Sequence, residues 1–321
     1  MRIVQTVIIG AALAAAGTAA AQNYPTRPIR IVVVSTPGGS VDTLARSIGP
    51  KLAEHWNQQV LVDNRPGAGG AIAAELVAKA QPDGYTLIMA TVASLATNVS
   101  LRKSLPYDPV KDFSPISLVA TQNLMLLIHP SVPAKSVKDL VALAKKQPGK
   151  LTFASAGNGT GGHLSGELFK LLAGIDLLHI PYKGVAPALI DVVSGQVSMT
   201  FASIISAMPQ VKNNRLRPLA VTGAQRSPAA KELPTMIEAG VKGYESATWY
   251  GLLAPAGTPA DIVSKLNAEV VAIVKSPEMN ERLSKEGADP VGNSPAEFAR
   301  HIRIEIEKWR KVIKAAGIAP S

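Results

Sequence analysis

A glycine-rich turn between an apolar stretch and an amphipathic stretch constrains the fold of this chain more than any other feature. Residues 151–154 are mostly apolar, as in a buried strand, and residues 155–162 read Ser-Ala-Gly-Asn-Gly-Thr-Gly-Gly. From His163 onward, leucines recur at helical spacing. A strand that turns directly into a helix leaves backbone N–H groups unpaired, and the helix dipole adds partial positive charge at the same point. The pattern therefore predicts an α/β fold with a site for a carboxylate or phosphate.

The same turn matches the G-x-G-x-x-G pattern of dinucleotide-binding proteins through Gly157, Gly159 and Gly162. In those proteins an acidic residue at the end of the next strand binds a ribose hydroxyl. The next predicted strand, residues 177–182, ends in Tyr182-Lys183-Gly184, and Asp176 precedes it instead of ending it. We therefore interpret the turn as an anion site and predict no nucleotide or other cofactor.

A second turn of this kind lies near the start of the chain. Residues 29–34 form a β-branched run, which is typical of a strand buried on both faces of a parallel sheet. Residues 35–40, Ser-Thr-Pro-Gly-Gly-Ser, then lead into a predicted helix with Ser40 as its N-cap and Asp42 in its first turn. Thr91 and Ser94 form a small polar edge after a third predicted strand, residues 85–90.

The N-terminus has the pattern of a secretory signal peptide. A basic start, an apolar run at residues 3–16 and an A-x-A site before Gln22 predict cleavage after residue 21 and export to the periplasm. The chain has no cysteine, which excludes disulfides and thiolate chemistry. Its net charge of +10 is scattered and only 4% of residues are aromatic, so we expect an anionic ligand and no nucleic acid. The five histidines show no metal-ligand spacing, so we expect no metal.

Strands and helices alternate along the rest of the chain, which predicts two α/β lobes, each with a parallel sheet. We assign residues 22–123 to lobe 1 and 124–247 to lobe 2, and expect two strands at residues 116–128 to cross between them. Residues 248–321 would return through a strand at 250–254 and complete lobe 1 with three helices, each opened by a proline. The predicted fold is two α/β lobes joined by two crossing strands, with the ligand cleft between lobes that close about a hinge.

Seven motifs in order and spacing closely resemble the Bug family, also called TctC-like. They cover essentially the whole chain after the signal peptide: Ser-Thr-Pro-Gly-Gly-Ser-Val-Asp (35–42), Asn-Arg-Pro-Gly-Ala-Gly-Gly (64–70), Pro-Asp-Gly-Tyr-Thr-Leu (82–87), Leu-Pro-Tyr-Asp-Pro-Val-Lys-Asp-Phe (105–113), Ala-Ser-Ala-Gly-Asn-Gly-Thr (154–160), Pro-Tyr-Lys-Gly (181–184) and Gly-Leu-Leu-Ala-Pro-Ala-Gly-Thr-Pro (251–259). The resemblance implies the fold of a two-lobed periplasmic binding protein, type II-like, and the role of a receptor of a tripartite tricarboxylate transporter. Such a receptor has no catalysis of its own and delivers small carboxylates to membrane subunits.

The resemblance and the strand ends together indicate which residues bind the ligand. In lobe 1 the candidates are Thr36, Pro37, Gly38, Gly39, Ser40, Asp42, Thr91 and Ser94. In lobe 2 they are Ser155, Ala156, Gly157, Asn158, Gly159, Thr160, His163, Tyr182, Phe201, Ala202 and Ser203. Asp42 can equally serve only as a helix-terminal charge, and His163 can be structural.

Three departures from the family pattern bear on specificity. Ser35-Thr36 replaces an aromatic residue or proline, Gly161-Gly162 replaces two serines, and Ala202-Ser203 stands where an aspartate often follows Phe201. The last difference argues against an amino-acid ligand. Two other functions stay open. A ligand-sensing receptor could present its closed form to a sensor kinase, whereas an exported hydrolase lacks a G-x-S-x-G or H-E-x-x-H motif.

Overall fold

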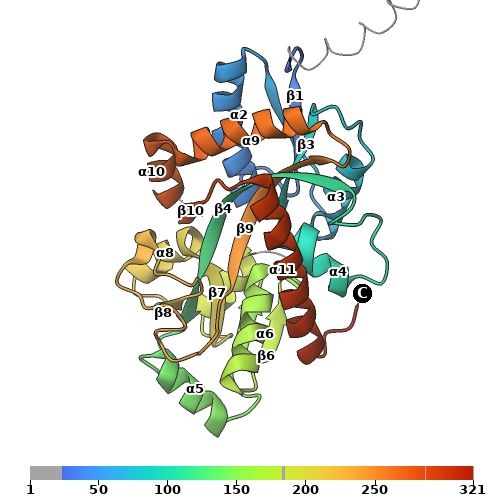
Figure 1. Ribbon diagram of the computed structural model, residues 1–321. Helices are drawn as coiled ribbons and strands as arrows, with labels where there is room; N and C mark the ends of the chain where they lie inside the picture. Colours follow the sequence, from blue (N-terminus) through green and yellow to red (C-terminus); the bar gives the residue numbers. More distant parts are fainter. Residues whose placement is uncertain (1–23, 183–184, 286, 321) are drawn as a thin grey trace, which may run out of the picture.

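A computed structural model describes residues 24–182, 185–285 and 287–320. The predicted signal peptide lies outside the described residues, as does Lys183, for which pairing with a ligand carboxylate is a hypothesis from the sequence. The described chain forms one mixed sheet that runs through two lobes, with helices on its faces (Figure 1). This architecture confirms the two-lobed α/β fold.

The sheet has the strand order β2-β1-β3-β9-β4-β7-β5-β6, with β10 and β8 also paired to β4. In the first lobe, β1 lies between β2 and β3 and is parallel to both; in the second, β5 is parallel to β6 and β7. Each lobe thus has the parallel strands that were expected, but β9, β4, β8 and β10 pair antiparallel, so the lobes share one mixed sheet instead of holding two separate parallel sheets. The strands are β1 Ile29–Val33, β2 Val60–Asn64, β3 Thr86–Thr91, β4 Phe113–Ile128, β5 Thr152–Ser155, β6 Leu178–Pro181, β7 Met199–Ser203, β8 Arg217–Val221, β9 Ala247–Pro255 and β10 Ala288–Pro290.

The connection between the lobes differs from the predicted pair of strands at residues 116–128. A single strand, β4, continues through this region and changes its partners midway: it pairs with β9 up to Asn123 and with β7 and β8 from Leu124 onward. The polar Thr121-Gln122-Asn123 segment suggested a break, but Gln122 and Asn123 are buried and stay in the ladder with β9. β9 is the second crossing, so the lobes share a two-stranded antiparallel ribbon.

Helices follow most strands and cover the sheet. They are α2 Ser40–Trp56, α3 Ala71–Ala78, α4 Asn98–Leu101, α5 Val137–Lys146, α6 Gly161–Ala173, α7 Val185–Val193, α8 Ile204–Lys212, α9 Ala260–Lys275, α10 Pro277–Lys285 and α11 Pro295–Ala315, with short turns η1 Ala68–Gly70, η2 Ala93–Thr97 and η3 Pro228–Ala230. Two predicted starts are corrected. The N-cap of α2 is Gly39 rather than Ser40, and Pro259 is the N-cap of α9 rather than its first residue.

The last helix, α11, packs against both lobes. It contacts β4, η2, α4 and α6, and it runs beside β9 and α6 in Figure 1. Its buried residues Phe298 and Trp309 belong to the same apolar core as Phe153 and Phe169 of the second lobe. A second core fills the space between β1, α2 and α9. The C-terminal helix therefore fastens the two lobes together along one side of the molecule.

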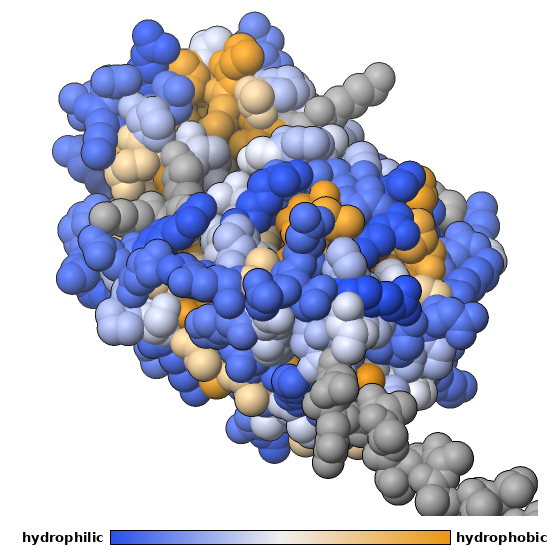
Figure 2. Space-filling model, turned by 90° about the horizontal axis from the view of Figure 1, so that it is seen from above, coloured by the Kyte–Doolittle hydropathy of each residue, from blue (hydrophilic) through white to orange (hydrophobic). Residues whose placement is uncertain are grey.

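The surface seen from above is mostly hydrophilic, and its hydrophobic residues form separate groups rather than a continuous band (Figure 2). Within the described ranges, no helix is both long and apolar enough to span a membrane.

Candidate ligand-binding site

Two adjoining cavities lie between the lobes. The outer cavity, of about 400 Å³, is lined by Gly38, Gly39, Ser40, Thr43, Leu44, Gln122, Val185, Ser203, Ser206, Tyr250, Leu283 and Ala288. The inner cavity, of about 190 Å³, is lined by Ser40, Gln122, Leu124, Ala156, Thr160, Gly161, Gly162, Val185, Ala188, Thr200, Phe201, Ala202, Ser203 and Thr248. Ser40, Gln122, Val185 and Ser203 border both cavities. The two spaces therefore form one interlobe cleft of the size that small-molecule sites have.

Four helices begin at this cleft. Ser40, Gly161 and Val185 are the first residues of α2, α6 and α7, and Ser203 is the N-cap of α8. Neither α2 nor α6 has a side-chain hydrogen bond that caps its first turn. Backbone N–H groups at both starts are thus available to a ligand, and the helix dipoles add partial positive charge. Among the described lining residues none carries a charged side chain, so the backbone dominates the electrostatics of the cleft.

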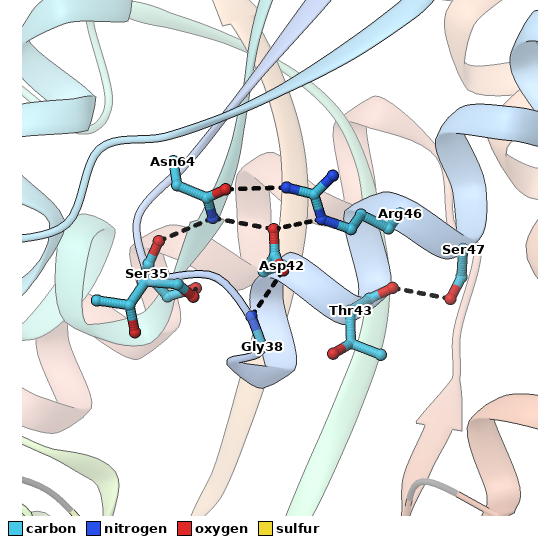
Figure 3. A network of polar contacts seen from close by, with 8 residues as sticks. Ser35, Gly38, Asp42, Thr43, Arg46, Ser47 and Asn64 are labelled. Carbon is cyan, nitrogen blue, oxygen red and sulfur yellow. Dashed lines mark hydrogen bonds and ion pairs between the residues drawn. The ribbon is translucent and has the colours of Figure 1, made fainter.

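The first turn, residues 35–40, is held in place by Asp42. Its buried carboxylate accepts hydrogen bonds from the Gly38 N–H at 2.8 Å, Arg46 Nε at 2.9 Å and Asn64 Nδ2 at 2.9 Å (Figure 3). Burial alone would raise the pKa of this carboxyl, but the hydrogen bonds from Gly38, Asn64 and Arg46 hold the pKa below its usual value. The carboxylate faces the backbone of its own turn and is not in the cleft lining. Its interactions are those of a residue that shapes the turn.

The second turn, residues 155–160, is stabilised by its own hydroxyl groups and by two histidines. Ser155 Oγ accepts from the Gly157 N–H at 3.1 Å, and Thr160 Oγ1 donates to the Gly157 carbonyl at 2.7 Å. His163 Nδ1 accepts from the Gly159 N–H at 3.0 Å. Ala156 and Thr160 reach the inner cavity. Asn158 and Gly159 instead line a separate cavity of about 170 Å³ beside Asn98 and Arg102.

Other predicted residues lie near the cleft without lining it. Ser94 Oγ bonds to the backbone N–H and carbonyl of Thr91, both at 3.0 Å, so this pair closes the end of β3. Tyr182 donates to Asp191 Oδ2 of α7 at 2.5 Å, and burial raises the pKa of its phenol to about 12. Thr36, Pro37 and Gly157 belong to the two turns but are not in the lining of either cleft cavity.

Gln122 and Thr248 of the crossing strands line the cleft and were missed by sequence reasoning. Tyr250 of β9 donates to Gln122 Oε1 of β4 at 2.5 Å, and both residues are buried. Gln122 pairs with Thr248 in the antiparallel ladder, which brings both of these polar side chains to the floor of the cleft. The sequence does show polar residues inside two apolar strands. That these side chains lie next to each other, however, depends on the pairing register of two strands that are far apart in the chain.

Gly161 and Gly162 let α6 approach the floor of the cleft closely. A Cβ at Gly161 would lie 2.7 Å from Thr248 Oγ1, and one at Gly162 would lie 2.7 Å from the Phe201 carbonyl oxygen. Real Cβ atoms do not come this close, so any side chain here would push the start of α6 away from β7 and β9. The two glycines therefore bring the α6 N-terminus against the crossing strands instead of supplying hydroxyl contacts.

No group of three potential metal-ligating side chains occurs in the part of the chain that the structure describes.

Comparison with known proteins assigns the chain to a family. Residues 44–318 match the model of the tripartite tricarboxylate transporter family receptor, TctC. Protein BugT of Bordetella pertussis is 36% identical over 314 residues, with 97% of this chain and 96% of BugT covered. A protein of Pseudomonas sp. strain P51, the UPF0065 protein in the tcbD-tcbE intergenic region, is 40% identical over 291 residues, with 90% of this chain and 86% of that protein covered.

Two solved structures are similar and carry ligands. Rpa4515 of R. palustris with adipate has a TM-score of 0.83 and 43% identity, with 93% of this chain and all of that chain (100%) covered. MatC of Rhodopseudomonas palustris with bound malate has a TM-score of 0.77 and 33% identity, with coverages of 90% and 100%. The extent of these matches, together with the cleft at the helix N-termini, shows that the chain belongs to the TctC family of solute-binding receptors.

Proposed function

We propose that this protein binds a small organic dicarboxylate in the interlobe cleft and delivers it to the membrane subunits of a tripartite transporter. One observation carries the proposal: helices α2, α6, α7 and α8 all begin at a cleft whose described lining has no charged side chain. A backbone site of this kind favours an anion and offers no carboxylate to an ammonium group. The adipate and malate found in two related structures belong to the same chemical class.

The shape of the cleft favours an acid with a charge at each end. The α2 start lies at the outer cavity and the α6 start at the inner one, so each can receive one carboxylate. Leu44, Leu283 and Ala288 line the outer cavity and suit methylene groups. An acid with a short apolar spacer, such as adipate, therefore serves as the first probe.

Ser40→Asp tests the anion site. An aspartate at the first position of α2 is compatible with the helix dipole, but it places a negative charge in both cavities. We expect wild-type protein to bind adipate in calorimetry, and this variant to lose at least about 100-fold in affinity through like-charge repulsion. Ser136→Asp, at the N-cap of α5, makes the same substitution outside the cleft and should leave affinity unchanged. Equal affinities for all three proteins would overturn the anion site.

Ligand class and delivery need separate measurements. In a thermal-shift screen with adipate, malate, glutamate and glucose, only adipate and malate, which carry no ammonium group, should raise the melting temperature. A hundredfold excess over Kd corresponds to about 2.7 kcal/mol of stabilisation. Shifts with glucose alone would contradict the proposal.

Uptake of labelled adipate by cells that carry the membrane subunits should require wild-type receptor and fail with Ser40→Asp. Mass spectrometry of the exported protein should give a chain that begins at Gln22.

A further inference from the structure

Two stacked histidines lie behind the second turn, outside the cleft lining. His163 of α6 and His179 of β6 have ring centroids 4.0 Å apart, and the Phe153 ring lies 4.7 Å from His179. His163 is 4% exposed. Neither histidine borders the outer or the inner cavity. A ligand in the cleft therefore does not explain why two imidazoles are packed together here.

Each imidazole bonds to a different end of the turn. His163 Nδ1 accepts from the Gly159 N–H at 3.0 Å. His179 Nε2 lies 2.7 Å from Ser155 Oγ, the same hydroxyl that accepts from the Gly157 N–H. A backbone N–H can only donate, so Nδ1 of His163 has no proton and its neutral ring carries the proton on Nε2. The conformation of residues 155–160 thus depends on an uncharged His163.

The packing around the rings keeps them uncharged. Burial, the neighbouring His179 and the Lys170 ammonium together lower the pKa of His163 to about 3. Burial and Lys170 lower the pKa of His179 to about 4. Glu167 Oε1 is 4.0 Å from His163 Nε2, but Glu167 also pairs with Lys170 at 3.0 Å, which offsets its charge. Both rings therefore stay neutral over the range in which a periplasmic receptor works.

We propose that His163 and His179 are positioning residues: they hold the second turn in its ligand-binding conformation through Gly159 and Ser155 without touching the ligand. The inference rests on the proposed function, because Ala156 and Thr160 carry the turn into the inner cavity. A turn released from His163 would free the Gly159 N–H and let the start of α6 lose its fixed place beside the cleft.

Two variants distinguish the effect of the His163–Gly159 hydrogen bond from the effect of the ring packing. His163→Phe keeps a stacked ring and removes the acceptor, whereas His163→Asn retains an oxygen close to the place of Nδ1. We expect hydrogen exchange of the Gly159 amide to become at least about tenfold faster in His163→Phe and to stay near wild type in His163→Asn. Adipate affinity should fall by a similar factor in His163→Phe and recover in His163→Asn, a split that a purely structural loss of packing would not give.

The test remains decisive if a variant does not fold or adipate does not bind. Nitrogen-15 shifts of the His163 ring in wild-type protein should show the Nε2–H tautomer at pH 7, and this measurement needs neither a variant nor a ligand. A proton on Nδ1, or equal Gly159 exchange in wild type and His163→Phe, would overturn the inference. Absence of adipate binding together with the expected tautomer and exchange would instead contradict the proposed ligand and leave the positioning role intact.

Discussion

The buried carboxylate of Glu305 provides the sharpest test of how the crossing strand is held. Glu305 of α11 is 5% exposed and its Oε2 accepts from the indole N–H of Trp249 at 3.0 Å and of Trp309 at 2.9 Å. Lys308 Nζ donates to Oε1 at 2.8 Å. Burial would raise the pKa of this carboxyl, but Lys308 and the two indoles hold the pKa below its usual value, so Glu305 is ionised at neutral pH.

Glu305→Ala leaves two buried indole N–H groups without this acceptor. Trp249 and Trp309 are 1% and 2% exposed, so water does not replace the lost bonds in the folded state. Each unpaired buried donor costs about 1–3 kcal/mol, so for the two indoles we expect a total loss of about 2–6 kcal/mol in the free energy of unfolding. In Glu305→Gln the amide oxygen can still accept from both indoles, so that variant should lose less than about half as much.

Urea unfolding followed by tryptophan fluorescence measures this loss directly, because two of the three tryptophans contact the carboxylate. Glu307→Ala, two residues along the same helix, removes an exposed ion pair with Arg310 and should cost less than about 1 kcal/mol. A Glu305→Ala transition within about 1 kcal/mol of wild type would refute the argument that the two indoles depend on this acceptor. Equal losses for Glu305→Gln and Glu305→Ala would show that the charge, rather than the acceptor geometry, is what matters.

The pH dependence of stability and three further substitutions have calculable outcomes. Because the pKa of His163 is about 3 in the folded state and near 6.5 unfolded, the unfolded chain binds more protons between these values. Stability should therefore fall as pH drops: His163 contributes roughly 1.5 kcal/mol between pH 6.5 and 5, and His179, whose pKa is also lowered, adds to the fall. The slope should flatten in His163→Asn without vanishing. Gly251→Ala should cost about 1–3 kcal/mol in thermal unfolding, because its Cβ would lie 2.0 Å from Phe298 Cζ. Gly49→Ala, with a 3.3 Å contact inside a helix, should be nearly neutral by the same assay. Asp42→Asn turns an amide N–H toward donors, so a loss of about 1–3 kcal/mol is expected, and an unchanged melting temperature would contradict its role in the first turn.

Local patterns in the sequence were sufficient for most of the fold. The β-branched run at the start predicted β1, and the leucine spacing from His163 onward predicted α6, which begins two residues earlier at Gly161. Both glycine-rich turns were located, because strand, glycines and helix follow each other within a few residues. These features depend on neighbours in the chain, which is why sequence periodicity reveals them.

Sequence periodicity did not predict which way the polar side chains point, nor which strands distant in the chain pair with each other. Asp42 and His163 were placed at the right turns, but their polar atoms face backbone N–H groups rather than the cleft. Gln122 and Tyr250 reach the cleft only because β4 and β9 pair antiparallel across the hinge. The polar residues in β4 suggested a break between two strands, yet buried hydrogen bonds to β9 and β10 satisfy them within one strand.

The C-terminal helix α11 contacts both lobes and so connects them along one side of the molecule. Figure 1 places α11 on one side of the shared ribbon and α8 and α10 on the other, where a groove between these two helices is lined by Met208, Glu281 and their neighbours. If the lobes part, the axis of rotation must run near the fastened side, and displacement must grow with distance from it. The lobes would then move far apart at the edge formed by α8 and α10 and hardly at all along α11. A transporter that distinguishes the open from the closed receptor would therefore find the largest structural difference at the α8–α10 edge.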